Sequence, residues 1–486
     1  MRILLASSEA HPYSKTGGLA DMVGALGKHL ARAGEEVVLL TPLYAGVRER
    51  FPGLQPFPLD APLDLPLGDA RVKGGLWHLQ PEPRFTVCFV DQPGFYLRSS
   101  LYHENGADYP DNAERFLFFS KAVVHVARHS KQPFDVLHVH DWQTGFVPLF
   151  VHHERTRAGW GTAPRTCMTI HNLAYQGVFP AGRYVLTNLP PDYFTADGVE
   201  FHGQMSCLKA GITYADILTT VSPRYAREIT TPELGCGLDA LLRRRNSSLV
   251  GILNGVDYDE WNTDRNPHLA RPYSVDDLSG KAVNKQKLQR ELGLPETPDV
   301  PLFGSVSRLV EQKGVDIQLS ALEEMLSTNL QFVLLGSGQA SFEEAYRALA
   351  RRYPTKVAVR IGYDAGLAHR IEAGCDFFLM PSRFEPCGLN QMYSLRYGTV
   401  PIVRATGGLD DTVIDVTEDA DRANGIKFLQ YTSRALARSI RKALALYGDK
   451  ELLVHYRSNA MLADFSWERT TARYIEVYRR LTGRMN

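Results

Sequence analysis

A chain of 486 residues exceeds the size at which a single hydrophobic core stops growing, so at least two domains are expected. Its 54 acidic and 54 basic residues balance, which gives no electrostatic case for nucleic acid or an anionic membrane as a partner. The 44% hydrophobic content is ordinary for a soluble enzyme, and no apolar run approaches the length of a membrane span.

The N-terminus and the cysteines predict a cytoplasmic protein. The polar residues Glu9 and His11 come too early for the hydrophobic region of a signal peptide. The six cysteines are scattered and form no C-x-x-C pair, so we expect reduced thiols rather than a disulfide framework or a zinc site.

The first segment predicts one unit of a parallel sheet. Residues 2–6 predict a short buried strand, and apolar residues at helical spacing predict a helix over 19–30. A second β-rich run over 35–42 completes the strand–loop–helix–strand unit. The loop between strand and helix lies at the carboxyl end of the first strand, where doubly wound sheets bind ligands.

This loop has the features of an anion site. A helix N-terminus offers free N–H groups and partial positive charge, Gly17 and Gly18 let a ligand approach the backbone, and Lys15 adds a full charge. The residue order is neither that of a P-loop nor that of the dinucleotide fingerprint. A tight turn with a solvated lysine explains the same residues.

Two further strands of the first half end in polar residues. One predicted strand ends near His140 and is followed by Asp141, and another ends near His171 and is followed by Asn172. His138 shares a strand face with His140, but two histidines and one aspartate fall short of a metal site, and we expect none. Asp141 is instead a candidate carboxylate of a ligand cleft.

A long loop over 94–116 combines tyrosines with polar side chains. Aromatic faces rimmed by polar groups suit carbohydrate, because pyranose rings present apolar C–H faces bordered by hydroxyls. The candidate acceptor-binding residues are Tyr96, Tyr102, Asp111 and Asn112. A plain structural loop accounts for them equally well.

A polar, turn-rich stretch over 255–280 predicts a domain boundary, after which the strand–loop–helix rhythm restarts. We therefore predict domains over 1–255 and 256–486. The final helix, at about 468–483, is a candidate to pack back on the first domain.

Two loops of the second half carry charged groups. Arg308 and Lys313 follow a strand and precede a helix, which suits a diphosphate because charge-assisted hydrogen bonds are strong; two surface ion pairs are the alternative. Glu385 follows a buried strand, just before a helix predicted to begin near Gly388. Its carboxylate could accept sugar hydroxyls, or it could simply cap the helix. Cys387 has no base nearby in sequence and is more consistent with a small, half-buried thiol than with a nucleophile.

Taken together, these stretches resemble the bacterial glycogen synthases and plant starch synthases across nearly the full length of the chain. The matching segments occur in the family's order and include "KTGGLADM", "DYPDNAERF", "HDWQTG", "HNLAYQG", "NGVD", "SRLVEQKG", "MPSRFEPCGLNQ" and "TGGLDDTV". The resemblance implies an α/β protein of the GT-B fold, with two Rossmann-like doubly wound domains facing a central cleft. It further implies retaining transfer of glucose from ADP-glucose to the non-reducing end of an α-1,4-glucan, with no cofactor or metal.

The resemblance also implies residue roles. Arg308 and Lys313 would stabilise the departing ADP, Glu385 would hold glucose hydroxyls, and the remaining catalytic residues would be Asp141 and His171. The donor-binding set would be Lys15, Gly17, Gly18, Asp21, Asn172, Asn254, Tyr363, Cys387, Gly388 and Leu389, with Tyr363 stacked on the nucleobase.

Three other activities share features with this sequence. A phosphorylase would need a lysine-linked pyridoxal phosphate, which no lysine here marks. A nucleotide-sugar epimerase would have no use for the aromatic loop. A glucan-binding protein without activity would have no reason to keep Lys15, Arg308, Lys313 and Glu385 together.

Overall fold

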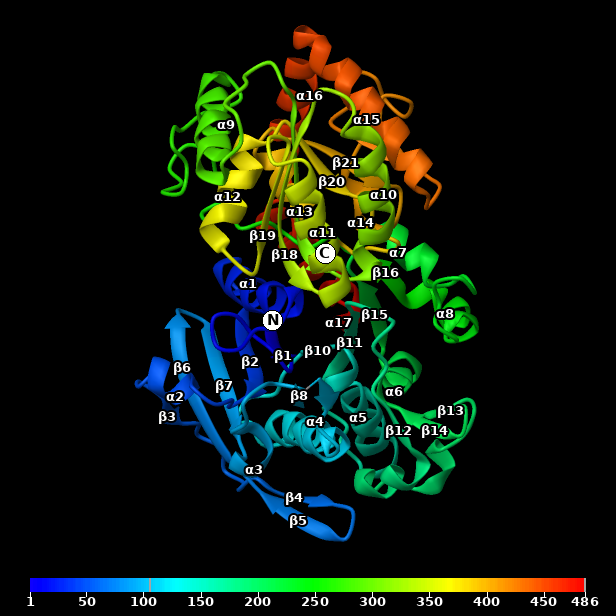
Figure 1. The fold of residues 1–486 in the computed structure, drawn as a ribbon. Coiled ribbons are helices and arrows are strands. Elements are labelled where there is room, and N and C mark those ends of the chain that lie inside the picture. Colours follow the sequence, from blue (N-terminus) through cyan, green and yellow to red (C-terminus); the bar gives the residue numbers. More distant parts are fainter. Residues whose placement is uncertain (105, 485–486) are drawn as a thin grey trace. The chain divides into compact units, whose positions relative to one another are not determined.

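The computed structural model describes residues 1–104 and 106–484 (Figure 1). The chain forms two compact units, each built around its own parallel sheet. The first comprises Met1–Val221, Ala226–Ile252 and Trp467–Asn486, and the second comprises Ser222–Tyr225 and Leu253–Ser466. The predicted functional domains, 1–255 on the acceptor side and 256–486 on the donor side, stay a prediction.

The sheet of the first unit has nine strands in the order β16-β15-β11-β10-β1-β2-β7-β6-β3, of which β6 and β3 run antiparallel at one edge. The central strands β1, β10 and β11 are buried along nearly their whole length because helices cover both faces. The strands are β1 (Arg2–Ala6), β2 (Glu36–Pro42), β3 (Gln55–Pro56), β6 (Gly75–Glu82), β7 (Phe85–Asp91), β10 (Val136–His140), β11 (Arg165–Ile170), β15 (Ile217–Thr220) and β16 (Leu249–Gly251).

The main helices of this unit are α1 (Gly18–Arg32), α4 (Asn112–His129), α5 (Phe146–Arg157), α6 (Cys207–Tyr214), α8 (Asp239–Arg244) and α17 (Trp467–Thr482). Helix α5 packs between α4 and α6 (Figure 1), and α17 packs on α1. The Tyr478 hydroxyl bonds His138 Nδ1 at 2.7 Å, and Trp467 stacks on His29. The last helix is therefore part of the core of the first unit.

The second unit is a six-stranded, all-parallel sheet in the order β19-β18-β17-β20-β21-β22, with apolar cores on both faces. Its strands are β17 (Leu302–Leu309), β18 (Gln331–Gly338), β19 (Val357–Ile361), β20 (Phe377–Met380), β21 (Val400–Arg404) and β22 (Ile426–Phe428). Its helices are α9 (Ser279–Leu292), α10 (Val315–Met325), α11 (Ala340–Arg352), α12 (Ala365–Gly374), α13 (Asn390–Arg396), α14 (Gly407–Thr412), α15 (Ser433–Gly448) and α16 (Lys450–Leu462).

Short elements complete the fold. They are α2 (Val47–Arg50), β4 (Asp64–Leu67), β5 (Ala70–Lys73), α3 (Pro93–Tyr96), β8 (His103–Glu104), β9 (Ala107–Asp108), β12 (Val178–Pro180), β13 (Glu200–Phe201), β14 (Gln204–Ser206) and α7 (Pro223–Glu228), with 3-10 turns η1 (Trp142–Thr144), η2 (Ala181–Thr187), η3 (Pro191–Tyr193), η4 (Asn246–Ser248) and η5 (Glu311–Lys313). Within the described residues, no helix combines the length and the apolar character needed to cross a bilayer.

Each sheet has one point at which the strand order reverses direction. In the first sheet β1 lies between β2 and β10, and in the second β17 lies between β18 and β20. Open parallel sheets bind ligands beyond the carboxyl ends of the strands at such a switch point. The loops after β1, β10, β17 and β20 are therefore where a site is expected, and they carry most of the predicted site residues.

Candidate active site

A largely buried ion pair joins the loops after β17 and β20. Lys313 Nζ donates to Glu385 Oε2 at 2.6 Å, and Ser382 Oγ donates to the same oxygen at 3.0 Å. The side chains of Lys313 and Glu385 are 19% and 8% exposed. An ammonium has three N–H groups, so two remain for a further acceptor. The structure thus brings together two of the residues predicted as catalytic.

Glycines let these loops pack directly on their neighbours. Gly314 has φ +72°, and a Cβ there would lie 2.1 Å from the Pro381 carbonyl oxygen. Gly407 has φ +45°, and a Cβ would lie 1.9 Å from the Glu385 carbonyl oxygen. Gly408 N–H donates to that same carbonyl at 3.1 Å. The first turn of α14 therefore supports the backbone of Glu385, which gives the "TGG" of residues 406–408 a physical reason.

The loop around Cys387 is held through its carbonyl groups. The Gln391 side-chain amide donates to the carbonyls of Cys387 and Gly388 at 3.0 and 3.1 Å, and Leu389 then leads into α13. Burial raises the pKa of the Cys387 thiol to about 12, while a backbone N–H of Asn254 opposes the shift. The thiol is therefore protonated at neutral pH and is no nucleophile. It is buried rather than half-buried as predicted.

Arg308 and Tyr363 are the exposed members of the set in the second unit. Arg308 is the second-last residue of β17, and its guanidinium donates a long hydrogen bond of 3.4 Å to the Gln312 side-chain oxygen. Tyr363 follows β19 and is 88% exposed. Both side chains are available to a ligand, and neither contacts Lys313 or Glu385 within the described residues.

In the first unit, Asp141 occupies a strained backbone position after β10, with φ +58°. Its carboxylate accepts the His171 N–H at 2.7 Å and also the Asn172 N–H. Burial raises the pKa of Asp141 to about 7, against the effect of those two bonds, and the charge of Glu9 raises it further. A buried, strained carboxylate at a switch point is typical of a functional site.

The raised pKa of Asp141 predicts a pH-dependent stability. The folded protein binds a proton that the unfolded carboxyl releases above about pH 4, so stability falls as the pH rises from about 4 through 7. Asp141→Asn should remove this loss and raise the free energy of unfolding at pH 8 by at most about 4 kcal/mol, with little effect at pH 4. Denaturant unfolding at both pH values measures it. Exposed Asp197→Asn serves as the control, and an equal effect of Asp141→Asn at both pH values would contradict the prediction.

His171 contacts a second histidine. Its Nε2 lies 3.0 Å from Nδ1 of His140. Burial lowers the pKa of His171 to about 3 and also lowers the pKa of His140 well below its usual value, so both rings are neutral at pH 7. Neighbouring His138 has both nitrogens engaged, by Tyr478 and Thr169.

The loop between β1 and α1 is organised by Glu9. The buried Glu9 carboxylate accepts bonds from the Thr16 backbone N–H and hydroxyl and, at 2.7 Å, from the Tyr102 hydroxyl. Lys15 Nζ pairs with Asp21 in the first turn of α1 at 2.8 Å. Gly17 has extended backbone and open space where a Cβ would lie, so neither conformation nor packing requires glycine there. Room for a ligand is the remaining reason, and Gly18 follows it as the first residue of α1.

The aromatic loop differs from its predicted role. Tyr96 is fully buried, with its hydroxyl donating to the Arg115 carbonyl at 2.9 Å, so its ring offers no face to a sugar and its prediction as an acceptor contact is wrong. Asn112 is buried and bonds Arg115, and Asp111 pairs with Arg98. The fully buried Arg115 guanidinium, which also donates to two loop carbonyls, is the reason the loop has this shape.

An open groove nevertheless lies beside this loop in the first unit. It encloses about 380 Å³, and Trp142 and the 53% exposed Tyr175 supply aromatic faces. Its lining is Asp108, Asn112, Trp142, Ala174, Tyr175, Gln176, Gly177, Val178, Phe179 and Phe201. The predicted acceptor residue Asn112 therefore reaches a groove.

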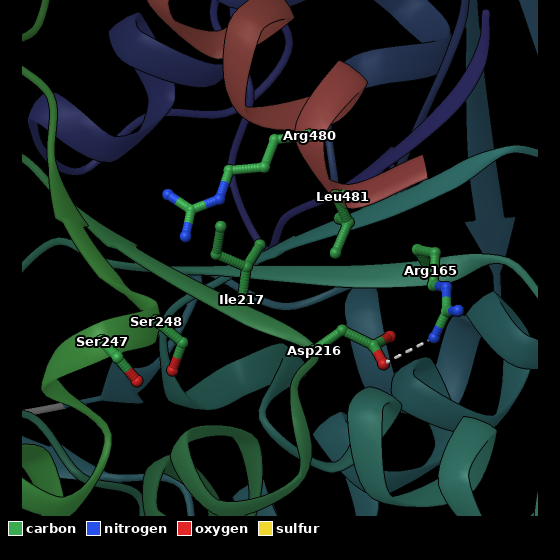
Figure 2. A pocket seen from close by; sticks show the side chains of 7 residues that line it. All are labelled: Arg165, Asp216, Ile217, Ser247, Ser248, Arg480 and Leu481. Atoms are coloured by element: carbon green, nitrogen blue, oxygen red, sulfur yellow. Dashed lines mark hydrogen bonds and ion pairs between the residues drawn. The ribbon is translucent and has the colours of Figure 1, made fainter. Parts of the chain in front are cut away.

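A second hollow of about 290 Å³ lies at the amino ends of strands of the same sheet (Figure 2). Arg165 and Ile217 line it at the amino ends of β11 and β15, and Arg480 of α17 points over it (Figure 2). None of the predicted site residues lines it, because those follow the carboxyl ends of strands.

Comparison with known proteins shows the family to which the chain belongs. Residues 2–244 match the model of the starch synthase catalytic domain, and residues 284–461 match that of the glycosyl transferases group 1. A glycogen synthase from Anaeromyxobacter dehalogenans (strain 2CP-C) is 48% identical over 486 residues, which cover 99% of this chain and 100% of that protein. The chain belongs to the glycogen synthase and starch synthase family.

Other known proteins are similar over nearly the whole of this chain. A glycogen synthase from Myxococcus xanthus (strain DK1622) is 47% identical, covering 98% of this chain and 99% of that protein. The catalytic domain of starch synthase IV from Arabidopsis thaliana, bound to ADP and acarbose, is 33% identical with a TM-score of 0.88, covering 99% of each chain. A sucrose-phosphate synthase from Thermosynechococcus elongatus, at 19% identity and TM-score 0.61, shares the fold. The predicted GT-B fold is confirmed. The chain is a hexosyltransferase with the glycogen synthase activity of its family.

Proposed function

We propose that the protein transfers glucose from ADP-glucose to the non-reducing end of an α-1,4-glucan, with retention of configuration and release of ADP. The observation that carries the proposal is the largely buried Lys313–Glu385 pair at the switch point of the second sheet, in a member of this family. A cation and a carboxylate held side by side suit a ligand that presents phosphate next to hydroxyls.

Each group has a role in the transfer. As the glucosyl–phosphate bond breaks, negative charge grows on the β-phosphate, and the free N–H groups of Lys313 and the exposed guanidinium of Arg308 stabilise it. Glu385 accepts hydrogen bonds from glucose hydroxyls. The proposal places no covalent nucleophile at the site. The acceptor hydroxyl attacks the anomeric carbon on the face from which ADP departs, and its proton passes to the departing phosphate.

We propose the groove beside Trp142 and Tyr175 as the acceptor site, because the half-buried Trp142 ring and the exposed Tyr175 ring suit the C–H faces of glucose units. Tyr175→Ala should raise the KM for glycogen about fivefold and leave the KM for ADP-glucose unchanged, since a ring contact of this kind contributes about 1 kcal/mol. Initial rates over a range of glycogen concentrations measure it. Val185→Ala, an exposed apolar residue that does not line the groove, is the control; an equal change of both KM values for Tyr175→Ala would contradict the assignment.

We also propose a cytoplasmic location. The scattered cysteines, which form no disulfide in the described residues, support it, and so does a sequence in which no apolar run approaches the length of a membrane span.

The direct test is ADP release from ADP-glucose with and without glycogen. Release that depends on glycogen, with growth of the glucan, supports the proposal. Equal release without glycogen indicates hydrolysis, and glycogen binding without release indicates a binding protein. A new nucleotide sugar in place of ADP indicates an epimerase, and each of these three results would overturn the proposal.

A further inference from the structure

The contact between His140 and His171 requires one ring to donate and the other to accept. The two nitrogens are 3.0 Å apart; His140 is buried, His171 is half-buried, and both rings are neutral. A neutral imidazole carries one hydrogen, so its two nitrogens have opposite roles. Two arrangements are possible, and they place the hydrogen of His171 on different atoms.

The other nitrogen of His140 distinguishes them. His140 Nε2 is buried and has no hydrogen-bond partner among residues 1–104 and 106–484. If His171 Nε2–H donated, His140 would carry its hydrogen on Nε2, as a buried N–H without an acceptor. If His140 Nδ1–H donates, Nε2 holds only a lone pair. Orphaned buried N–H groups are rarer and more costly than acceptors left unpaired.

None of the neighbouring residues that the structure describes offers an acceptor to His140 Nε2. The His138 ring centroid lies 4.1 Å from that of His140, but His138 Nδ1 and Nε2 bond the hydroxyls of Tyr478 and Thr169. The His140 main chain is also fixed, since its N–H donates to the Thr144 hydroxyl at 2.9 Å. The arrangement in which His140 Nδ1–H donates to His171 Nε2 is therefore the favourable one.

We propose that His140 is a positioning residue that fixes His171 in the tautomer with hydrogen on Nδ1, so that His171 presents an N–H donor to the sugar substrate. His171 is only partly buried, and its Nδ1 makes no hydrogen bond within the part of the chain that is described. An N–H there binds a sugar hydroxyl or the oxygen of a glucosyl group without adding charge. This role rests on the proposed function, whereas the tautomer itself does not.

The tautomer can be measured directly. Nitrogen-15 NMR of the histidine-labelled full chain distinguishes protonated from bare ring nitrogens, and a His171→Gln spectrum assigns the His171 signals. We expect Nδ1–H for His171 in the wild type. In His140→Phe, which keeps a ring but removes the donor, His171 should revert to Nε2–H, the form preferred by free imidazole side chains.

Kinetics test the role of the tautomer. His140→Phe should lower kcat/KM for ADP-glucose roughly tenfold, the value of one neutral hydrogen bond, without changing the KM for glycogen. His140→Asn can place an amide N–H near the position of Nδ1, so it should stay within about threefold of the wild type. Rescue by asparagine separates donation from simple packing.

Several results would overturn the proposal. Nε2–H on His171 in the wild type would do so whether or not the enzyme is active, and even if His140→Phe failed to fold. Nδ1–H combined with unchanged kcat/KM in His140→Phe would refute the positioning role. A wild type that releases no ADP from ADP-glucose would refute the proposed function instead, while the NMR result would still decide the tautomer.

Discussion

Lys313→Ala is expected to lower kcat for glucan elongation from ADP-glucose about a hundredfold, which corresponds to about 3 kcal/mol of transition-state stabilisation. The KM for ADP-glucose should change much less, because the charge that Lys313 stabilises grows mainly as the glucosyl bond breaks. Steady-state ADP release at saturating glycogen measures both constants.

The ion pair itself provides the control for this variant. Lys313→Ala leaves the Glu385 carboxylate buried without its cation, which costs stability as well as activity. The double variant Lys313→Ala, Glu385→Gln removes that buried charge, so it should recover thermal stability but not kcat. Lys287→Ala, at an exposed position of α9, should change neither. Recovery of kcat in the double variant would show that Lys313 acts only by neutralising Glu385.

Gly407→Ala is expected to remove more than 99% of the activity and to lower the free energy of unfolding by about 3 kcal/mol. Its φ of +45° strains any side chain, and the new Cβ would lie 1.9 Å from the Glu385 carbonyl oxygen, so the loop carrying Glu385 must move. Rates of ADP release and urea unfolding measure the two effects.

Gly448→Ala is the matched control. Gly448 ends α15 and has open space where a Cβ would lie, so alanine there should be neutral or slightly stabilising. If Gly407→Ala kept more than a tenth of the wild-type kcat at unchanged stability, the argument that α14 supports Glu385 would fail.

The sequence was sufficient to predict the strand–loop–helix units and the position of their loops. The predicted strand over 2–6 is confirmed as β1, and the helix predicted over 19–30 is confirmed within α1. Local periodicity carries this information, and the carboxyl ends of parallel strands necessarily meet at one edge of a sheet. Asp141, Lys313 and Glu385 could therefore be singled out before any contact was known.

The supporting residues could not be predicted in the same way. Glu9 accepts hydrogen bonds from Thr16 and Tyr102, and Gly407 packs against the Glu385 carbonyl. The contacts with Tyr102 and Glu385 join chain segments far apart in sequence. The one available signal for Glu9 was a carboxylate just after the first strand. The burial of Tyr96 was missed because its loop has no periodicity that separates inward from outward side chains.

The place of α17 in the first unit has a consequence for biosynthesis. Domains generally fold as they leave the ribosome, with the N-terminal one first. Here the first unit lacks Tyr478, the partner of His138, until nearly every residue has been translated. The second unit, which is almost continuous from Leu253 to Ser466, can reach its native state earlier. The order of maturation is thus the reverse of the order of synthesis, and an interrupted chain leaves the first unit unfinished.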